Sequence, residues 1–305
     1  MQIKLPSGIT FFERGWLSSN NVLLHDAEQA VLIDTGYWSH AQQTVELLTS
    51  ALQDRPLTKI INTHLHSDHC GGNSLLQQVY PNVETLIPPG HAEFVKNWNP
   101  YALSYTPTGQ HCPKFLATNI ILDSQEFTIA GNSWKIHAAP GHDPNSIILF
   151  CKKHGVLISA DALWQRGFGV VFPELEDQSA FDEVESTLNL IDSLSPQIVI
   201  PGHGSIFDNV TESIAYARQR LANFRTYPER HINYAAKVLL KFKLLELQQI
   251  SFNELLAWAR VNVYLNHIHR NYFNKKSFED WIINKCTELE TNGALIRNGQ
   301  ILVNA

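Results

Sequence analysis

Short apolar or β-branched runs, separated by glycine, asparagine and aspartate, mark the first two thirds of the chain and predict strands. These strands are expected at residues 9–12, 21–25, 30–34, 58–62, 83–87, 120–122, 127–129, 134–138, 146–151, 156–159 and 198–200. Apolar positions with helical spacing lie between them at 39–52, 73–79, 90–97 and 179–194, with Ser39 as the expected N-cap of the first helix. The alternation of strands and helices predicts an α/β domain.

The pattern changes after Pro201, where helical periodicity dominates. Helices are predicted at 211–225, 229–247, 252–263 and 277–290. The last residues, ALIRNGQILVNA, predict a hairpin with the pair Asn298-Gly299 in a type I′ turn. Helices followed by a hairpin are typical of a winged helix. We therefore expect two domains, 1–210 and 211–305, with the boundary falling between residues 210 and 225.

Charge is divided unevenly between these two parts. Residues 1–210 contain 10 basic and 21 acidic side chains, a net charge of -11, whereas residues 211–305 contain 13 and 8, a net charge of +5. Four cysteines are widely spaced without a CxxC pair, which favours a reducing compartment over a disulfide scaffold. The sequence shows neither a secretory signal nor a run of 18 apolar residues. We expect a cytoplasmic protein without membrane association, and the oligomeric state stays open.

Three histidines and one aspartate lie within six residues in the segment His64-Leu65-His66-Ser67-Asp68-His69, directly after a predicted strand. Imidazole nitrogens and carboxylate oxygens suit zinc or another borderline divalent metal. In a turning loop His64 and His66 can point the same way, while Asp68 and His69 face a second position. One ion does not easily take all four ligands, so the spacing indicates two metal ions.

The HLHSDH segment resembles the HxHxDH signature of the metallo-β-lactamase superfamily. The other motifs of that family follow in the family's order over about residues 8–210. They are VLIDTG with Asp34, APGH with His142, ISAD with Asp161 and IPGHG with His203. The resemblance implies the four-layer αβ/βα sandwich of the superfamily, followed here by a mainly helical, winged-helix-like domain.

The same resemblance implies a ligand set and a reaction. One metal ion would be held by His64, His66 and His142, a second by Asp68, His69 and His203, and Asp161 would bridge them. The implied cofactors are two divalent ions, with zinc preferred and iron or manganese also suited. A hydroxide shared by such ions attacks an electrophilic carbonyl or phosphorus. Asp68 is the expected catalytic carboxylate that orients this hydroxide, and Asp34 is expected to hold a ligand loop or imidazole in place.

Several neighbouring residues allow two interpretations each. Asp143 is either a carboxylate that supports the site or an exposed turn residue, and Cys70 is expected to be a small buried thiol. Other histidines are expected outside the site, with His137 the one that could face it. The aromatic residues Trp164, Phe168 and Phe172 either wall a substrate pocket or pack in the core. In the irregular stretch 99–118, the candidate lid residues are Tyr101, Tyr105 and His111.

A complete ligand set is similar to that of glyoxalase II-like thioesterases, lactonases, and the phosphodiesterases and nucleases of the superfamily. True β-lactamases with this motif are exported and usually lack the bridging aspartate. We therefore expect hydrolysis of a small-molecule ester, thioester or lactone. The alternative is an endoribonuclease-like phosphodiesterase of single-stranded nucleic acid, because the helical tail resembles the lactamase-β-2-like branch and is basic. That tail has no run of lysine or arginine, however. A further alternative is a mononuclear iron dioxygenase.

Overall fold

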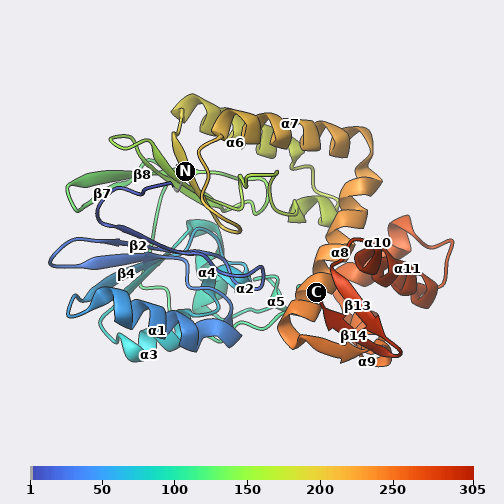
Figure 1. Ribbon diagram of the computed structural model, residues 1–305. Coiled ribbons are helices and arrows are strands. Elements are labelled where there is room, and N and C mark those ends of the chain that lie inside the picture. The colour runs from blue at the N-terminus through green and yellow to red at the C-terminus, as the bar shows by residue number, and fades with distance from the viewer. Residues whose placement is uncertain (1–2) are drawn as a thin grey trace. The chain divides into compact units, whose positions relative to one another are not determined.

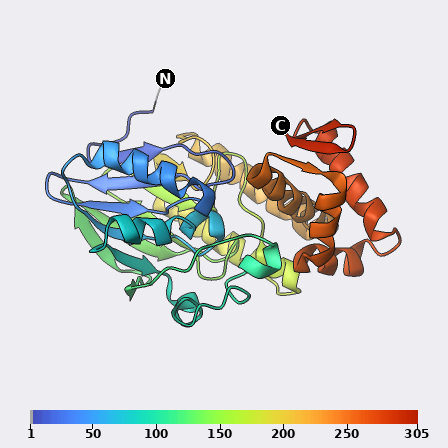
Figure 2. The ribbon, with the colours of Figure 1, turned by 90° about the horizontal axis from the view of Figure 1, so that it is seen from below.

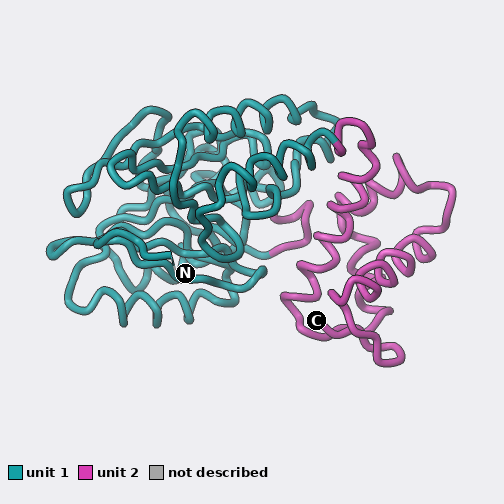
Figure 3. The backbone as a smooth tube through the Cα atoms, turned by 45° about the horizontal axis from the view of Figure 1, so that its top comes forward, with its two compact units in different colours: residues 1–103, 111–222 teal, residues 104–110, 223–305 magenta. Residues whose placement is uncertain are grey.

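The computed structural model describes residues 3–305, which divide into two compact units. Unit 1 comprises the chain up to Leu103 together with His111–Ala222, and unit 2 comprises Ser104–Gln110 and Asn223–Ala305 (Figure 3). We call Ser104–Gln110 the inserted segment, because it belongs to unit 2 although both of its flanks belong to unit 1.

Unit 1 is built on two sheets. The first has the strand order β1-β2-β3-β4-β5-β6, in which β1 to β3 are antiparallel and β3 to β6 are parallel. Its strands are β1 (Ile9–Phe12), β2 (Asn21–His25), β3 (Ala30–Ile33), β4 (Leu57–Ile61), β5 (Glu84–Ile87) and β6 (Asn119–Ile120). The second sheet has the order β11-β10-β9-β8-β7, with only the β10–β11 pair parallel. Its strands are β7 (Glu126–Ile129), β8 (Asn132–Ala138), β9 (Ile147–Cys151), β10 (Val156–Ala160) and β11 (Ile198–Pro201).

Helices cover the outer face of each sheet. Figure 1 shows α1 (Ala41–Leu52) and α3 (Asn73–Val79) against the first sheet, and α6 (Phe181–Leu194) and α7 (Val210–Thr226) against the second. Figure 2 shows the α1 and α3 side of the first sheet from below. The order helix, sheet, sheet, helix confirms the predicted α/β sandwich.

The alternation along the strands separates two apolar cores. Val22 and Leu24 of β2 pack with Ile136 and Leu149 of the second sheet, whereas Leu23 packs with leucines of α1 and α3. Successive side chains of a strand point to opposite faces, so one strand supplies both cores. Because both faces of the central strands are covered, these strands have apolar residues at consecutive positions.

Unit 2 combines helices with a small sheet of order β12-β14-β13. Its elements are α5 (Tyr105–Thr108), α8 (Pro228–Leu247), β12 (Gln249–Ser251), α9 (Phe252–Val261), α10 (Val263–Tyr272), α11 (Phe278–Thr291), β13 (Leu295–Asn298) and β14 (Ile301–Asn304). The inserted segment is held by the side chain of Asn262, whose Nδ2 donates to the Thr108 carbonyl at 2.8 Å. Gly109 has a φ of +68°, and a Cβ there would lie 2.7 Å from Nε1 of Trp258. None of the helices in residues 3–305 is long and apolar enough to cross a membrane.

Most predicted strands occur within two residues of their expected positions, and three local predictions were wrong. Ser39 does not cap a helix but lies inside a 3₁₀ turn, Trp38–His40, that precedes α1. The helix predicted at 252–263 ends at Val261, where Asn262 caps the unpredicted α10 by accepting from the backbone of Leu265. The terminal hairpin has the two-residue loop 299–300 with a positive φ only at Gly299, a feature of type II′ rather than type I′.

Candidate metal centre

The seven residues expected to be metal ligands lie together in unit 1, in three overlapping groups. The groups are His64, His66 and His142; His64, His69 and Asp161; and Asp68, His69 and His203. In each group the possible ligand atoms lie within 4.8 Å of one another. The residues come from segments that follow β4, β8, β10 and β11, and from α2 (Ser67–Cys70). The sandwich therefore brings strand ends that are distant in sequence to one edge.

Three imidazole nitrogens converge in the first group. Nε2 of His142 lies 2.8 Å from Nδ1 of His66 and 3.2 Å from Nε2 of His64. A hydrogen bond between two neutral imidazoles uses the proton of one and the lone pair of the other, so three nitrogens facing one point cannot all be satisfied by each other. Three nitrogen lone pairs around one point are the donor set that a divalent metal of the zinc type takes.

Asp161 lies between the two ends of the cluster. Its Oδ2 is 3.4 Å from Nε2 of His142 and 3.8 Å from Nε2 of His203, and its Oδ1 is 3.5 Å from Nε2 of His69. At the far end, Oδ2 of Asp68 lies 3.2 Å from Nε2 of His203. Both carboxylates therefore face ring nitrogens. A cation placed between these oxygen and nitrogen atoms would contact both kinds of ligand.

One buried atom tests whether a metal fits. Nε2 of His69 is buried and has no hydrogen-bond partner among the described residues. A buried polar atom without a partner is destabilising unless another group satisfies it. Since this nitrogen faces Asp161 and belongs to two of the three ligand groups, a divalent cation at this position satisfies it. The residues present fit a metal centre.

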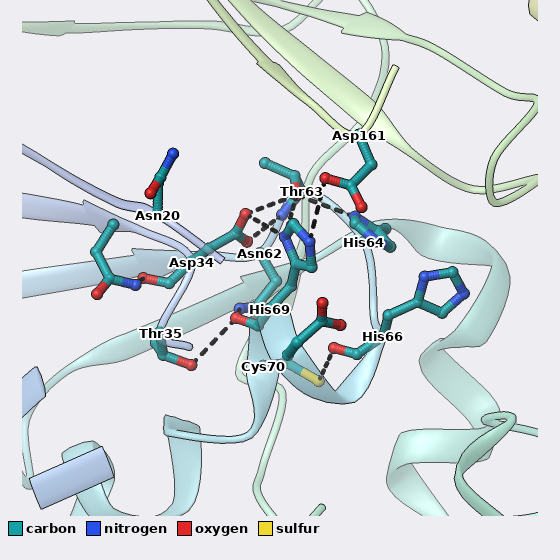
Figure 4. A network of polar contacts seen from close by, with 12 residues as sticks. Asn20, Asp34, Thr35, Asn62, Thr63, His64, His66, His69, Cys70 and Asp161 are labelled. Carbon is teal, nitrogen blue, oxygen red and sulfur yellow. Dashed lines mark hydrogen bonds and ion pairs between the residues drawn. The ribbon is translucent and has the colours of Figure 1, made fainter. Parts of the chain in front are cut away.

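Asp34 organises two of the imidazoles (Figure 4). Its Oδ2 accepts from Nδ1 of His69 and from Oγ1 of Thr63, both at 2.8 Å, and its Oδ1 accepts from the Thr63 backbone at 2.8 Å. The Thr63 hydroxyl in turn lies 3.1 Å from Nδ1 of His64. With protons on both Nδ1 atoms, the Nε2 lone pairs of His69 and His64 point to the cluster. The expectation that Asp34 holds an imidazole in place matches this contact.

Backbone and carboxylate groups orient two further imidazoles. Nδ1 of His142 lies 2.6 Å from the Val170 carbonyl, so this ring donates there and keeps its Nε2 lone pair for the cluster. Asp143 is buried, and its Oδ2 is 3.8 Å from Nε2 of His66. Of the two interpretations of Asp143, the exposed turn residue is excluded, because the side chain faces a cluster imidazole.

Electrostatics separate the two ends of the cluster. Burial lowers the pKa of His64 well below its ordinary value and that of His66 to about 4. Burial also opposes protonation of His69, but Asp161, Asp34 and Asp68 together raise its pKa well above the ordinary value. The carboxylate end therefore attracts a positive charge, whereas His64 and His66 at the other end stay neutral and keep free lone pairs.

Both carboxylates of the cluster are held in the ionised form. Burial alone would raise the pKa of Asp161, but His203 and His69 outweigh it and lower that pKa well below its usual range. Burial likewise acts against the lowering of the Asp68 pKa, which His69 and His203 produce. Asp68 is also the more accessible of the two, with 14% of its side chain exposed against 6% for Asp161.

Close backbone approaches fix the loops that carry the ligands. A Cβ at Gly169 would lie 2.4 Å from Nδ1 of His142, and one at Gly202 would lie 2.2 Å from Oδ1 of Asp161. The φ angles of Asp34 and Ala160 are +57° and +46°, in a region that residues other than glycine rarely adopt. Backbone strain of this kind persists where the surrounding structure determines the conformation, and here it lies at or beside cluster residues.

Aromatic rings border the cluster. Trp164 donates from Nε1 to Oδ1 of Asp161 at 3.2 Å, and the ring of Phe172 lies 4.7 Å from that of His66. Phe168 is 1% exposed and therefore packs in the interior. Trp16, which sequence reasoning missed, stacks on His203 with centroids 5.4 Å apart. Trp16 lies between β1 and β2, outside the sequence motifs. Only the folded structure shows that it is close to the cluster.

The remaining candidates lie outside the cluster. Cys70 is a buried thiol outside any disulfide, as expected, and it is absent from the ligand groups of the described residues. His137 interacts with charged residues of β7 and β8 and joins none of these groups either. Of the candidate lid residues, Tyr101 is exposed, but Tyr105 is 2% exposed within the inserted segment. His111 packs edge-on against Trp38 at 4.8 Å.

Comparisons with known proteins show which family the chain resembles. The family model described as the metallo-beta-lactamase superfamily matches residues 14–203. A beta-lactamase-like protein 2 homolog of Drosophila melanogaster is 28% identical over 65% of this chain and 62% of its own length. An atrochrysone carboxyl ACP thioesterase of Aspergillus fumigatus is 22% identical over 64% of this chain and 54% of its own. The chain thus spans only about three fifths of these two relatives.

Two further similarities extend the comparison. An acyl-coenzyme A thioesterase of Homo sapiens is 26% identical over 67% of this chain and 80% of its own length. The crystal structure of a metallo-beta-lactamase family protein of Thermus thermophilus matches 99% of this chain and 100% of its own with a TM-score of 0.60 and 16% identity, which supports the fold. The predicted family, its fold and the prediction of an enzyme of this hydrolase family are confirmed. The chain belongs to the metallo-beta-lactamase superfamily.

Proposed function

We propose that this protein is a metal-dependent hydrolase of small-molecule thioesters. The observation that carries the proposal is the buried convergence of seven imidazole and carboxylate side chains, among which Nε2 of His69 has no hydrogen-bond partner in residues 3–305. The thioester class is supported by the names of two relatives, an acyl-coenzyme A thioesterase and an ACP thioesterase. Esters and lactones share the same electrophilic carbonyl and stay within the proposal.

We propose two divalent ions, preferably zinc, as the cofactors. The ligands would be His64, His66 and His142 for one ion and Asp68, His69 and His203 for the other, with Asp161 shared. When bound, such ions supply a water of lowered pKa and stabilise the negative charge that develops on the carbonyl oxygen. Nitrogen ligands dominate the first group and carboxylates are added in the second, and both donor sets suit zinc as well as iron or manganese.

Asp68 is the proposed catalytic carboxylate. Its side chain is more exposed than that of Asp161, and the neighbouring imidazoles keep its pKa below the ordinary value. It is therefore ionised at neutral pH and can accept a hydrogen bond from the attacking water. The fixed protons on Nδ1 of His69 and His142 keep the opposite ring nitrogens directed at the cluster during this step.

The walls of the site suit an acyl group. Trp16, Trp164 and Phe172 present aromatic surface beside His203, Asp161 and His66, respectively. Trp16 is 55% exposed, so its ring can contact a bound molecule. An apolar acyl chain loses unfavourable contact with water on such a surface, whereas a phosphodiester would place its charge near two ionised carboxylates.

Metal analysis and a substrate panel test the proposal. The purified chain should contain about two transition metal ions and should hydrolyse acyl-coenzyme A thioesters faster than lactones, phosphodiesters or short single-stranded RNA. Asp161→Ala should lose metal and activity together, while Asp54→Ala, which removes an exposed carboxylate, should lose neither. Preferential cleavage of RNA would replace the proposal with the phosphodiesterase alternative. One iron per chain with oxygen consumption would replace it with the dioxygenase alternative.

We also propose that residues 1–210 form the catalytic domain and that residues 211–305 form a helical, winged-helix-like domain. Support for the second assignment comes from the order of elements in unit 2, in which helices alternate with β12 and end in the β13–β14 hairpin. We propose a cytoplasmic location because the four cysteines are buried and form no disulfide. Limited protease digestion tests the domain assignment, since the first cuts should fall near residue 210 rather than inside either proposed domain.

A further inference from the structure

His203 differs from the other imidazoles of the cluster in how it is held. Nδ1 of His69 donates to Asp34, Nδ1 of His142 donates to the Val170 carbonyl, and Nδ1 of His64 faces Thr63. In contrast, Nδ1 of His203 is buried and finds no hydrogen-bond partner anywhere in residues 3–305. Metal-binding histidines usually donate this second ring proton to an acceptor that fixes the ring, so something else must orient His203.

Two indole rings enclose His203 instead. Trp16 lies parallel to it, with an interplanar angle of 7° and centroids 5.4 Å apart. Trp164 meets it edge-on, with an angle of 81° and centroids 5.6 Å apart. The two indoles also contact each other at 5.3 Å in an edge-on arrangement. The imidazole therefore has one face and one edge fixed by packing alone.

We infer that Trp16 and Trp164 form an aromatic clamp that positions His203 for the second metal ion, in place of the missing hydrogen bond. Trp164 has an additional role in this clamp, because its Nε1 donates to Oδ1 of Asp161. It thus orients two of the proposed ligands, one by its ring and one by its N–H group. The inference rests on the proposed metal-dependent function and assigns positioning residues to it.

The physical basis of the clamp is its response to charge. An imidazole that binds a cation becomes electron-poor, and the electron-rich face of an indole attracts a positive charge. The stack of Trp16 on His203 is therefore stronger when the ring is a metal ligand than when it is neutral and free. An aromatic pair of this kind contributes a modest free energy. Its loss should therefore lower the affinity for the second ion roughly three- to tenfold. The first ion, on the imidazole end, should be unaffected.

Stepwise metal titration of the full chain tests the clamp. Zn²⁺ affinities for the two steps are measured by competition with a chromophoric chelator, and Co²⁺ spectra report the ligand field of each step. Trp16→Ala should weaken only one of the two steps, and Trp16→Phe should restore most of the affinity because it keeps an aromatic face. Trp164→Phe keeps an edge but removes the N–H donor to Asp161, so it should change the Co²⁺ spectrum as well. The control is Trp38→Ala, since Trp38 packs on Tyr37 and His111 rather than on a cluster ring.

The outcomes separate this inference from the proposed function. Trp16 is half exposed, so the metal-stripped Trp16→Ala chain should unfold at the wild-type temperature, which excludes a folding defect. If Trp16→Ala binds two ions with unchanged affinities, or if both binding steps are weakened equally, the clamp alone is overturned. Failure of Trp16→Phe to recover affinity also overturns it. A wild-type chain that takes up fewer than two ions overturns both the clamp and the two-metal proposal.

Discussion

Replacing Asp34 by asparagine should weaken metal binding while leaving the backbone in place. Asp34 has a φ of +57°, a conformation that asparagine tolerates better than most residues, so the turn itself is retained. The asparagine can keep the acceptor that receives the Thr63 backbone N–H. It replaces the other carboxylate oxygen, which accepts from His69 and from the Thr63 hydroxyl, with an amide donor.

This single change reverses the direction of two hydrogen bonds. An amide N–H₂ facing Nδ1 of His69 favours the tautomer that has its proton on Nε2, which removes the lone pair needed at the cluster. The same amide can donate to the Thr63 hydroxyl, which then donates to Nδ1 of His64 and disfavours the correct tautomer there as well. Loss of a group that orients one metal ligand typically reduces affinity 10- to 100-fold, or about 1.4–2.8 kcal/mol. Because Asp34 supports two imidazoles, we expect the upper part of this range.

Competition titration with a chromophoric chelator measures the effect in the absence of substrate. The matched control is Asp177→Asn, because Asp177 is exposed and has the same φ of +57°. This control should bind metal like the wild type. The tautomer argument is refuted if Asp34→Asn and Asp177→Asn bind metal with equal affinity, or if Asp34→Asn lowers thermal stability equally with and without metal.

Three further predictions test the packing of Gly169 against His142, the pKa of His66 and the division of the chain into two units. Gly169→Ala should abolish metal binding, since its Cβ would lie 2.4 Å from His142, whereas Gly15→Ala, which meets nothing within 4 Å, should be neutral in the same titration. In the metal-stripped chain His66 should contribute a loss of about 1.6 kcal/mol of stability between pH 6.5 and pH 5, because unfolded His66 takes up a proton that the folded ring, with a pKa of about 4, does not. Urea unfolding at the two pH values should show a smaller loss in His66→Gln. Deletion of residues 226–305 removes the unit 2 residues that hold the inserted segment and should cause aggregation in size-exclusion chromatography; a monodisperse truncated chain would contradict this expectation.

The cluster could be located from sequence because its chemistry is concentrated at strand ends. His64, His66 and His69 lie in one run after β4, which ends in two buried isoleucines, and Asp161 follows β10 directly. Parallel neighbours such as β10 and β11 bring their carboxyl ends to the same edge, so Asp161 and His203 are expected to meet. Buried strands followed by polar loop residues produce a strong local signal, which is why the sequence could place these side chains together; that they bind metal stays a prediction.

Other features depend on tertiary contacts that leave no local signal. The helix predicted at 252–263 passes through Asn262, but Asn262 turns its side chain to cap the next helix and to hold the inserted segment. Irregular composition at 99–118 suggested a lid, whereas Tyr105 is buried in unit 2. Helix periodicity cannot reveal either result, because the cap depends on how one side chain turns, and the inserted segment meets Asn262 through Thr108, 154 residues earlier in the chain.

The contacts around the cluster explain why the sequence motifs point to the proposed ligands and to Asp34, but not to the other groups that orient the rings. A ligand must supply a nitrogen or oxygen atom, so only a few residue types qualify and their pattern is visible in sequence. An orienting group needs only to fix a ring, and three different groups do so here: a carboxylate for His69, a backbone carbonyl for His142 and an indole face for His203. A backbone carbonyl has no sequence signature at all, and an exposed tryptophan resembles any surface aromatic residue. Apart from Asp34, the orienting groups therefore follow from the structure, and substitution of Asp34 or Trp16 should change metal affinity without removing a proposed ligand.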